Sequence, residues 1–375
     1  MDNKRRVGVV GTGFIGAVHI ENLRRLPNVE VVSIMTTQNL EETKKKYNVE
    51  NVYDDVYKMI DESNLDVIHI CSPNYTHAII AIYALDKGVN VFCEKPMALT
   101  VEESEQMLKA QKRNNLLAGL NFHNRFFATV SEMRHQDIGE PISVHGQYIQ
   151  DWLLYQEDYS WRLISKESGN TRAIGDIGSH WFDLAQFTTG LKITEVLAEF
   201  KTQYPIRKKQ RGTTETFQKA DETAEFDDIP IDTEDIASVI VKFENGATGN
   251  VFISQMVAGQ KNNYTLTISG TKSSLTWQSI DANNLFIGHR NEPNQILTKD
   301  PSLLNTNTAH LSAYPGGHFE GFGDAFRHVF IDFYKHLDNP NHTPCYATFE
   351  EGVYLSKIIQ AVYESAQSRT WVTVE

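Results

Sequence analysis

The chain has 375 residues, of which 41% are hydrophobic and 22% are charged, so it is too long for one small domain and has the composition of a folded protein. Its 35 Lys and Arg residues and 48 Asp and Glu residues give a net charge of −13, which excludes a broad basic surface for nucleic acid or anionic lipid. We therefore expect a small molecule as the partner, with no nucleic acid and no membrane.

The N-terminal segment MDNKRRVGVVG contains no apolar stretch of the length that a signal peptide needs. The apolar run at residues 78–85 is far shorter than the roughly 20 residues that cross a bilayer. The three cysteines include no C-x-x-C pair, which suits a reducing compartment. We therefore expect a cytoplasmic protein without a membrane span.

The first third of the chain alternates short apolar runs with amphipathic stretches, which is typical of a parallel sheet with helices on its faces. The predicted strands are 7–10, 29–35, 67–71 and 89–92. The predicted helices are a segment that ends near residue 26, then 40–47, 76–87 and 101–114. This rhythm predicts a doubly wound α/β fold.

From about residue 121 the pattern changes to longer strands, which predicts a second, sheet-rich domain. The predicted elements are strands at 142–148, 237–243, 247–253 and 264–268, helices at 323–337 and 349–368, and a short strand at 371–374. Asn245 and Gly246 between two of these strands predict a hairpin turn, because both residue types accept positive φ at little cost. The charged segment 205–235 is interpreted as a solvated loop, with a functional surface as the alternative.

The glycine-rich sequence GTGFIG at residues 11–16 follows the first predicted strand and opens a helix. In such a loop the first glycine makes a tight turn, the second lets backbone N–H groups approach a pyrophosphate, and the third lets helix and strand pack closely. The predicted cofactor contacts are Gly11, Gly13, Phe14, Ile15 and Gly16. We therefore assign residues 1–121 to a dinucleotide-binding Rossmann domain, with a purely structural glycine turn as the alternative.

Thr36 and Thr37 end the second predicted strand, where an acidic residue usually binds the adenosine ribose of NAD. Without that carboxylate a 2′-phosphate is tolerated, yet no arginine stands there to attract one. Both threonines are predicted cofactor contacts, and the cofactor is predicted as NAD or NADP without a preference.

The next two predicted strands run into polar residues at the edge where open parallel sheets bind ligands. The predicted cofactor contacts are Cys71, Ser72, Pro73, Asn74, His77, Glu94 and Lys95. For residues 71–74 the alternative is a plain strand-to-helix turn, and for His77 it is capping or packing. Lys95 is cationic at neutral pH and is placed to stabilise a developing alkoxide or to share its proton, unless it is an ordinary surface lysine.

Asp176 and His180 in the sequence GDIGSHWFD are four residues apart, which places a carboxylate and an imidazole on one face of a helical turn. Imidazole suits proton exchange with an alcohol, and a neighbouring carboxylate can orient it. The alternative is a structural His/Asp pair. Farther on, the stiff loop YPGGHFEG carries His318, and it is predicted either to line a polar pocket or to form the entry to a helix.

Metal and hydrolase chemistry are not indicated. There is no H-E-x-x-H sequence, no two of the 13 histidines lie within four residues of each other, and a G-x-S-x-G elbow is absent. We expect no metal site.

Taken together, GTGFIG, CSPNYTH, EKPMALT, NFHNRF and GDIGSHWFDLAQF resemble the glucose-fructose oxidoreductase / inositol dehydrogenase (Gfo/Idh/MocA) family over nearly the whole chain. The combination of EKP with D-x-G-x-H-x-x-D is its specific part. The resemblance implies that the catalytic residues are Lys95, Asp176 and His180. It implies that the substrate contacts are Arg125, Trp161, Arg162, Asp176, His180 and His318.

The resemblance also implies that residues 122–375 form a substrate-binding and oligomerisation domain of α/β type. Its large, open, mostly antiparallel sheet would face a partner subunit in a homodimer or homotetramer. We expect an NAD(P)-dependent dehydrogenase that transfers a hydride between nicotinamide and a secondary hydroxyl or ketone of a sugar, anhydrosugar or inositol-like polyol. The alternatives are a non-catalytic NAD(P)-binding sensor of the same fold and a reductase of a non-sugar substrate, such as an imine or a tetrapyrrole.

Overall fold

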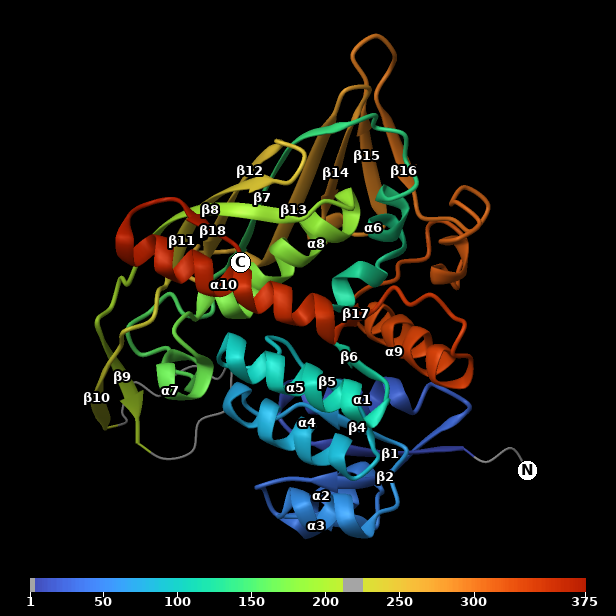
Figure 1. Ribbon diagram of the computed structural model, residues 1–375, viewed down its shortest axis with the longest axis vertical. Helices are drawn as coiled ribbons and strands as arrows, with labels where there is room; N and C mark the ends of the chain where they lie inside the picture. The colour runs from blue at the N-terminus through green and yellow to red at the C-terminus, as the bar shows by residue number, and fades with distance from the viewer. Residues whose placement is uncertain (1–3, 212–224) are drawn as a thin grey trace. The chain divides into compact units, whose positions relative to one another are not determined.

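The computed structural model describes residues 4–211 and 225–375 (Figure 1). The chain divides into two units, Met1–Arg125 with Phe322–Ser356 and Phe126–Gly321 with Lys357–Glu375. Residues 322–356 thus group with the N-terminal residues, whereas the sequence analysis assigned everything after residue 121 to one domain. Each unit is built on a large sheet of its own.

The first unit contains a seven-stranded sheet with the order β17-β6-β5-β4-β1-β2-β3. Its strands are β1 (Arg5–Val10), β2 (Val29–Met35), β3 (Asn51–Tyr53), β4 (Val67–Ile70), β5 (Asn90–Cys93), β6 (Ala118–Leu120) and β17 (Ala347–Thr348). Its helices are α1 (Phe14–Leu23), α2 (Leu40–Tyr47), α3 (Val56–Glu62), α4 (His77–Asp86), α5 (Val101–Asn114) and α9 (Phe322–Asp338). All neighbouring strands run parallel except β17, and the order of β1 to β6 is that of a dinucleotide-binding Rossmann fold.

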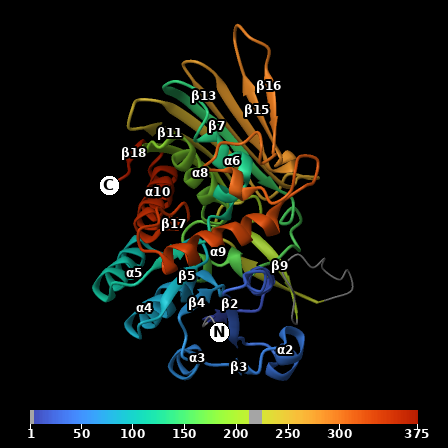
Figure 2. The ribbon, with the colours of Figure 1, turned by 90° about the vertical axis from the view of Figure 1, so that its right-hand side faces the viewer.

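Helices cover both faces of this sheet (Figures 1 and 2). α4 packs between α3 and α5, and α1 packs against α9. The chain moves one way along the sheet from β1 to β3 and the other way from β4 to β6. Right-handed crossovers therefore place α1 on one face of the sheet and α4 and α5 on the opposite face. β4 is buried along its whole length as a result, which explains why its sequence is apolar except for His69.

The predicted elements of the first unit are confirmed, and β2, α2 and α5 have the predicted bounds. β3, β6, β17 and α3 were not predicted from the sequence, and β6 and β17 have only three and two residues. β3 has three residues, too few to show a period, and α3 has seven residues. The start of α3 does carry a local signal, because the Asp55 side chain accepts the N–H groups of Tyr57 and Lys58.

The second unit contains a nine-stranded sheet with the order β16-β15-β14-β13-β7-β12-β11-β8-β18. Its strands are β7 (Pro141–Gln150), β8 (Ile193–Lys201), β11 (Ile236–Phe243), β12 (Thr248–Ser254), β13 (Lys261–Gly270), β14 (Ser274–Gln278), β15 (Asn284–Gly288), β16 (Gln295–Thr298) and β18 (Val372–Thr373). Only β7 and β12 pair in parallel, so the sheet is mostly antiparallel as expected. The predicted Asn245–Gly246 turn joins β11 to β12, and Gly246 has φ +87°.

One face of the nine-stranded sheet is covered and the other is open. The helices of this unit are α6 (Ala128–Met133), α7 (Ser165–Ser168) and α8 (Ser179–Thr189), and α10 (Phe349–Ser368) continues into it from the first unit. α8 packs on β7 and β13, and α6 packs on β14 and β15. The strand register places Ile240, Phe252, Phe286 and Ile296 on the opposite face, where all four side chains are exposed.

The prediction of a solvated loop at 205–235 is wrong for the two ends of that segment. β9 (Ile206–Gln210) and β10 (Phe226–Pro230) pair as an antiparallel hairpin, while residues 212–224 lie outside the described residues. Arg207, Glu234 and Asp235 are no more than 2% exposed. Charged side chains are buried when they are paired, and a local count of charges cannot reveal a partner that is distant in the sequence.

Over residues 4–211 and 225–375, no helix is both long enough and apolar enough to span a bilayer.

Candidate active site

The glycine loop of the first unit gives its three glycines three different surroundings. Gly11 has φ +93°, and a Cβ there would lie 2.9 Å from the carbonyl oxygen of Cys71. A Cβ on Gly16 would lie 2.0 Å from the carbonyl oxygen of Gly11, so α1 approaches the loop this closely only without a side chain. A Cβ on Gly13 would meet nothing within 4 Å. The open space at the N-terminus of α1 fits the pyrophosphate of a dinucleotide.

The predicted contacts at the end of β2 have distinct surroundings. Thr36 is buried, and its hydroxyl oxygen lies 2.6 Å from that of Thr12 in the glycine loop. This hydrogen bond ties the end of β2 to the loop. Thr37 and Phe14 are exposed, and Ile15 is partly buried. Their roles as cofactor contacts stay predictions.

His77 links two loops at the same edge of the sheet. Residues 71–74 are partly buried, as a segment beside a ligand can be. His77 is fully buried, and its ring nitrogens both lie 2.9 Å from backbone carbonyl oxygens, Nε2 from that of Ser72 and Nδ1 from that of Pro96. The ring therefore holds the loop after β4 against the loop after β5. This placement favours the packing alternative over direct contact with a cofactor.

Glu94 anchors the residue that precedes Lys95. Its carboxylate accepts hydrogen bonds from His19 Nε2 at 2.9 Å, from Asn121 Nδ2 at 2.5 Å and from the backbone N–H of Lys95 at 3.2 Å. Burial by itself raises the pKa of Glu94, but the hydrogen bond and charge interaction with His19, together with Lys95 and Asn121, lower it to about 2. Glu94 is therefore an ionised side chain that fixes the backbone of Lys95, itself half-buried.

The hydrogen bond from His19 to Glu94 continues into a buried series of contacts between aromatic side chains. His19 Nδ1 lies 3.0 Å from His69 Nδ1, and His69 Nε2 lies 3.0 Å from the hydroxyl of Tyr334 on α9. Burial and the neighbouring His19 ring hold the pKa of His69 well below its usual range, so His69 is neutral at neutral pH. These contacts explain why a histidine lies in the apolar strand β4. They also connect α1, β4 and α9 to Glu94.

We expect Glu94→Gln to lower the free energy of unfolding in a pH-dependent way. Because the folded-state pKa is depressed from 4.5 to about 2, the ionised carboxylate contributes stability above pH 4.5 that is lost as the pH falls toward 2. The difference between wild type and variant should be roughly 3 kcal/mol near neutral pH and should shrink through that range. Urea denaturation at a series of pH values measures it.

The exposed Glu50 offers a matched control, because Glu50→Gln removes a carboxylate of the same unit. That variant should follow the wild-type dependence on pH. A difference for Glu94→Gln that stays constant as the pH falls from 4.5 toward 2 would contradict the depressed pKa.

Arg125 is 4% exposed, and its guanidinium is engaged within the first unit. Nη1 donates to the carbonyl oxygen of Cys345 at 3.1 Å, and Nη2 pairs with Glu351 at 2.9 Å. These contacts give Arg125 a structural task, and its predicted contact with substrate stays a prediction.

In the second unit Asp176 lies in a π-helical turn, η4 (Ile174–Gly178), directly before α8. The four-residue spacing of Asp176 and His180 predicts an ordinary helical turn here. At this π-helical turn the Glu234 carboxylate accepts the N–H groups of Arg172 and Ile174, and Ser179 Oγ donates to the carbonyl oxygen of Gly175. Such turns occur frequently at functional sites.

The two oxygens of Asp176 have different partners. Oδ2 accepts a hydrogen bond from Gln255 Nε2 at 2.8 Å, and Oδ1 lies 3.5 Å from Arg162 Nε. The guanidinium of Arg162 also lies over the ring of Trp161, 4.6 Å from its centroid. The structure therefore brings three predicted site residues together, Asp176, Arg162 and Trp161.

His180 is the second residue of α8 and is 4% exposed. Its carbonyl oxygen accepts a hydrogen bond from the Tyr264 hydroxyl at 2.9 Å, and its ring centroid lies 6.1 Å from that of Tyr148. The rings of Tyr148 and Tyr264 stack with centroids 4.7 Å apart. Burial and the nearby Asp176 charge raise the pKa of Tyr148, so its hydroxyl keeps its proton at neutral pH.

His318 lies on an exposed loop of the second unit. Lys299 fixes this loop. Its ammonium donates to the carbonyl oxygens of Tyr314 and His318 and pairs with Glu320. A loop tied down in this way can present a side chain in a fixed place, and the role of His318 in binding substrate stays a prediction.

Several polar residues that support the site were not predicted from the sequence, namely His19, His69, Asn121, Tyr148, Arg172, Glu234 and Gln255. Some carried a weak signal, because His69 interrupts the apolar run VIHIC and Gln255 lies two residues after the predicted strand 247–253. Their partners are distant in the sequence, so the signal did not indicate a function.

The two units define a class of protein. The first unit has the strand order and the glycine loop of an NAD-binding domain, with open space for a pyrophosphate. In the second unit the carboxylate of Asp176 lies beside the guanidinium of Arg162, and the imidazole of His180 lies near the ring of Tyr148. This combination belongs to nicotinamide-dependent oxidoreductases. A model of the Gfo/Idh/MocA oxidoreductases, described as NAD-binding Rossmann fold, matches residues 5–122, and the model of their C-terminal alpha/beta domain matches residues 132–374. The chain belongs to the Gfo/Idh/MocA oxidoreductase family.

Named relatives act on sugars and cyclic polyols. The chain is 28% identical over 390 residues to levoglucosan dehydrogenase of Pseudarthrobacter phenanthrenivorans, covering 98% of this chain and 97% of that protein. It is 29% identical over 200 residues to myo-inositol 2-dehydrogenase of Thermotoga maritima, covering 52% of this chain and 58% of that protein.

Solved structures agree with this relationship. The fold matches that of levoglucosan dehydrogenase in complex with NADH and L-sorbose with a TM-score of 0.88 and 25% identity, over 100% of this chain and 99% of that one. An oxidoreductase domain protein from Kribbella flavida matches with a TM-score of 0.88 and 26% identity over 100% of both chains. The chain is therefore an oxidoreductase with an NAD-binding domain, as predicted.

Proposed function

We propose that the protein transfers a hydride between nicotinamide and a secondary hydroxyl, or the matching ketone, of a sugar, anhydrosugar or inositol-like polyol. The observation that carries this proposal is the pairing of Asp176 with Arg162 and Gln255, four residues before His180 in the second unit, in a chain whose named relatives act on such compounds. When bound, the nicotinamide cofactor accepts or returns the hydride.

Three side chains of the protein would have distinct roles at the reacting alcohol. His180 accepts the hydroxyl proton, the Lys95 ammonium holds the oxygen and steadies its negative charge, and Asp176 orients the pair. Lys95 and His180 can exchange the first two roles, so the proton acceptor is a property of the pair. Glu94 fixes the backbone of Lys95, because its carboxylate accepts a hydrogen bond from the Lys95 N–H.

We further propose NAD as the preferred cofactor. The hydroxyl of Thr36 is engaged with Thr12, and none of residues 36–38 is an arginine that could pair with the 2′-phosphate of NADP. The relative solved with L-sorbose carries NADH, which supports the same choice.

The test is a turnover assay that follows the absorbance of reduced nicotinamide. Both oxidised cofactors are offered with levoglucosan, inositols, aldoses, glucose 6-phosphate and sugar acids, and the matching ketones are offered with both reduced cofactors. We expect turnover with NAD and at least one polyol or anhydrosugar. Binding of NAD without turnover on the whole panel would contradict the proposal and favour the sensor.

We also propose that the open face of the nine-stranded sheet pairs with a second copy of the chain. The exposed Ile240, Phe252, Phe286 and Ile296 form an apolar set on that face, which a monomer would leave in water. Light scattering coupled to size exclusion would detect the dimer or tetramer, and Phe252→Glu should shift the population toward monomer. A monomeric wild-type protein would contradict the proposal.

A further inference from the structure

Gln255 directly follows β12 and is fully buried between two charged side chains. Its Nε2 donates to Asp176 Oδ2 at 2.8 Å, and its Oε1 accepts from Arg172 Nη1 at 2.9 Å. The same Nε2 lies 3.3 Å from Gln150 Oε1. The amide thus stands between a buried guanidinium and the carboxylate of the proposed active site.

The orientation of this amide is dictated by its neighbours. A guanidinium has donors and no acceptor, so Arg172 requires the oxygen of the Gln255 amide to face it. The NH₂ group must then face Asp176, which accepts its hydrogen bond as a carboxylate. A reversed amide would place two donors together on one side and two oxygens on the other.

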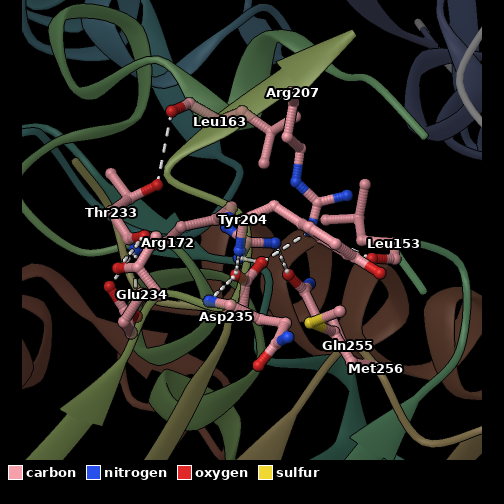
Figure 3. Close-up of polar contacts among 12 residues, drawn as sticks. Leu153, Leu163, Arg172, Tyr204, Arg207, Thr233, Glu234, Asp235, Gln255 and Met256 are labelled. Atoms are coloured by element: carbon pink, nitrogen blue, oxygen red, sulfur yellow. Dashed lines mark hydrogen bonds and ion pairs between the residues drawn. The ribbon is translucent and has the colours of Figure 1, made fainter. Parts of the chain in front are cut away.

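Arg172 is itself held in place from several sides, as Figure 3 shows. Its Nη2 and that of Arg207 share the Asp235 carboxylate, and Glu234 accepts its backbone N–H. All of these side chains are buried. Two guanidinium and two carboxyl side chains make up the group, so its charges can compensate one another.

We propose that Gln255 is a positioning residue for Asp176, and that Arg172 sets the direction of its hydrogen bond. The proposal rests on the function proposed above. By donating to the ionised form, Gln255 stabilises the carboxylate and fixes one of its oxygens, while the other oxygen faces Arg162. Arg207, Glu234 and Asp235 come from the described ends of the 205–235 segment, and these ends support Arg172.

The test compares two variants of nearly the same shape as the native side chain. Gln255→Met removes the donor and should lower kcat by about 10- to 100-fold, with little change in the KM for NAD. Losing a donor to the ionised form raises the pKa of the carboxyl, so the acid limb of the pH profile of kcat should move to higher pH. Gln255→Glu places a second carboxyl against Asp176 and should move the limb farther in the same direction.

Gln278→Met is the matched control, because it makes the same replacement at an exposed residue of β14. It should keep both the wild-type kcat and the wild-type pH profile. A structural role for Gln255 alone would lower the stability of the Met and Glu variants without moving the acid limb, and that result would overturn the proposal.

A second measurement separates this inference from the proposed function. Protein labelled with ¹³C at the aspartate carboxyl, with Asp176→Asn to assign the resonance, reports the pKa of Asp176 whether or not a substrate has been found. We expect a higher pKa in Gln255→Met than in wild type. An unchanged pKa would overturn the inference, whereas a raised pKa in a protein without dehydrogenase activity would support it and refute only the function.

Discussion

Lys95→Met is expected to lower kcat by about 10²- to 10⁴-fold while the Kd for NAD stays near that of wild type. The methionine keeps the length of the side chain and removes the ammonium, so only the stabilisation of the alkoxide oxygen and the proton exchange are lost. Glu94 binds the backbone N–H of residue 95, which the substitution leaves unchanged. Single-turnover kinetics with saturating NAD and the best substrate of the panel measure the effect.

Lys87→Met provides the control for this experiment. Lys87 is an exposed residue of the same unit, paired with Asp61, and its replacement removes a surface charge far from the glycine loop in sequence. It should leave kcat and the Kd for NAD unchanged. Wild-type turnover in Lys95→Met would remove Lys95 from the proposed mechanism.

Gly13→Ala is expected to weaken NAD binding by at least about tenfold without lowering the free energy of unfolding. A Cβ at residue 13 has open space around it, and the φ of −64° suits alanine, so the apo fold tolerates the change. The added methyl group occupies the space that fits the pyrophosphate. Isothermal titration with NAD and urea denaturation separate the two effects.

Two further glycine variants provide comparisons for Gly13→Ala. Gly16→Ala places its Cβ 2.0 Å from a backbone oxygen, so it should lower stability as well as NAD affinity. Gly321→Ala has open space around its Cβ and lies in the second unit, so it should change neither quantity. Unchanged NAD affinity in Gly13→Ala would contradict the placement of the pyrophosphate over residue 13.

The first unit could be predicted almost completely from the sequence. β2, α2 and α5 have the predicted bounds, because a mostly buried parallel strand and a capped helix each leave a local pattern of residues. The missed β3, β6, β17 and α3 are too short to show a period. The glycine loop was recognisable because its chemistry needs a fixed spacing within six residues.

The supporting residues of the site could not be predicted in the same way. Glu94 depends on His19 and Asn121, and Asp176 depends on Gln255, which stands 79 residues away along the chain. A buried hydrogen bond between distant segments leaves no periodic trace in either segment. The charged ends of the 205–235 segment illustrate the consequence, because their composition is that of a solvated loop and their partners make them buried.

The sequence by itself determined the alternation of strands and helices in the first domain, the glycine loop and the residue types of the proposed catalytic group, because these depend on spacing and on patterns of apolar residues within short segments. Only the tertiary structure decided which side chains hold Lys95 and Asp176 in place and which charged residues are buried. The physical reason is that burial and hydrogen-bond partners are set by the packing of segments far apart in the chain, and the energy of a buried charge depends on the partner that this packing supplies.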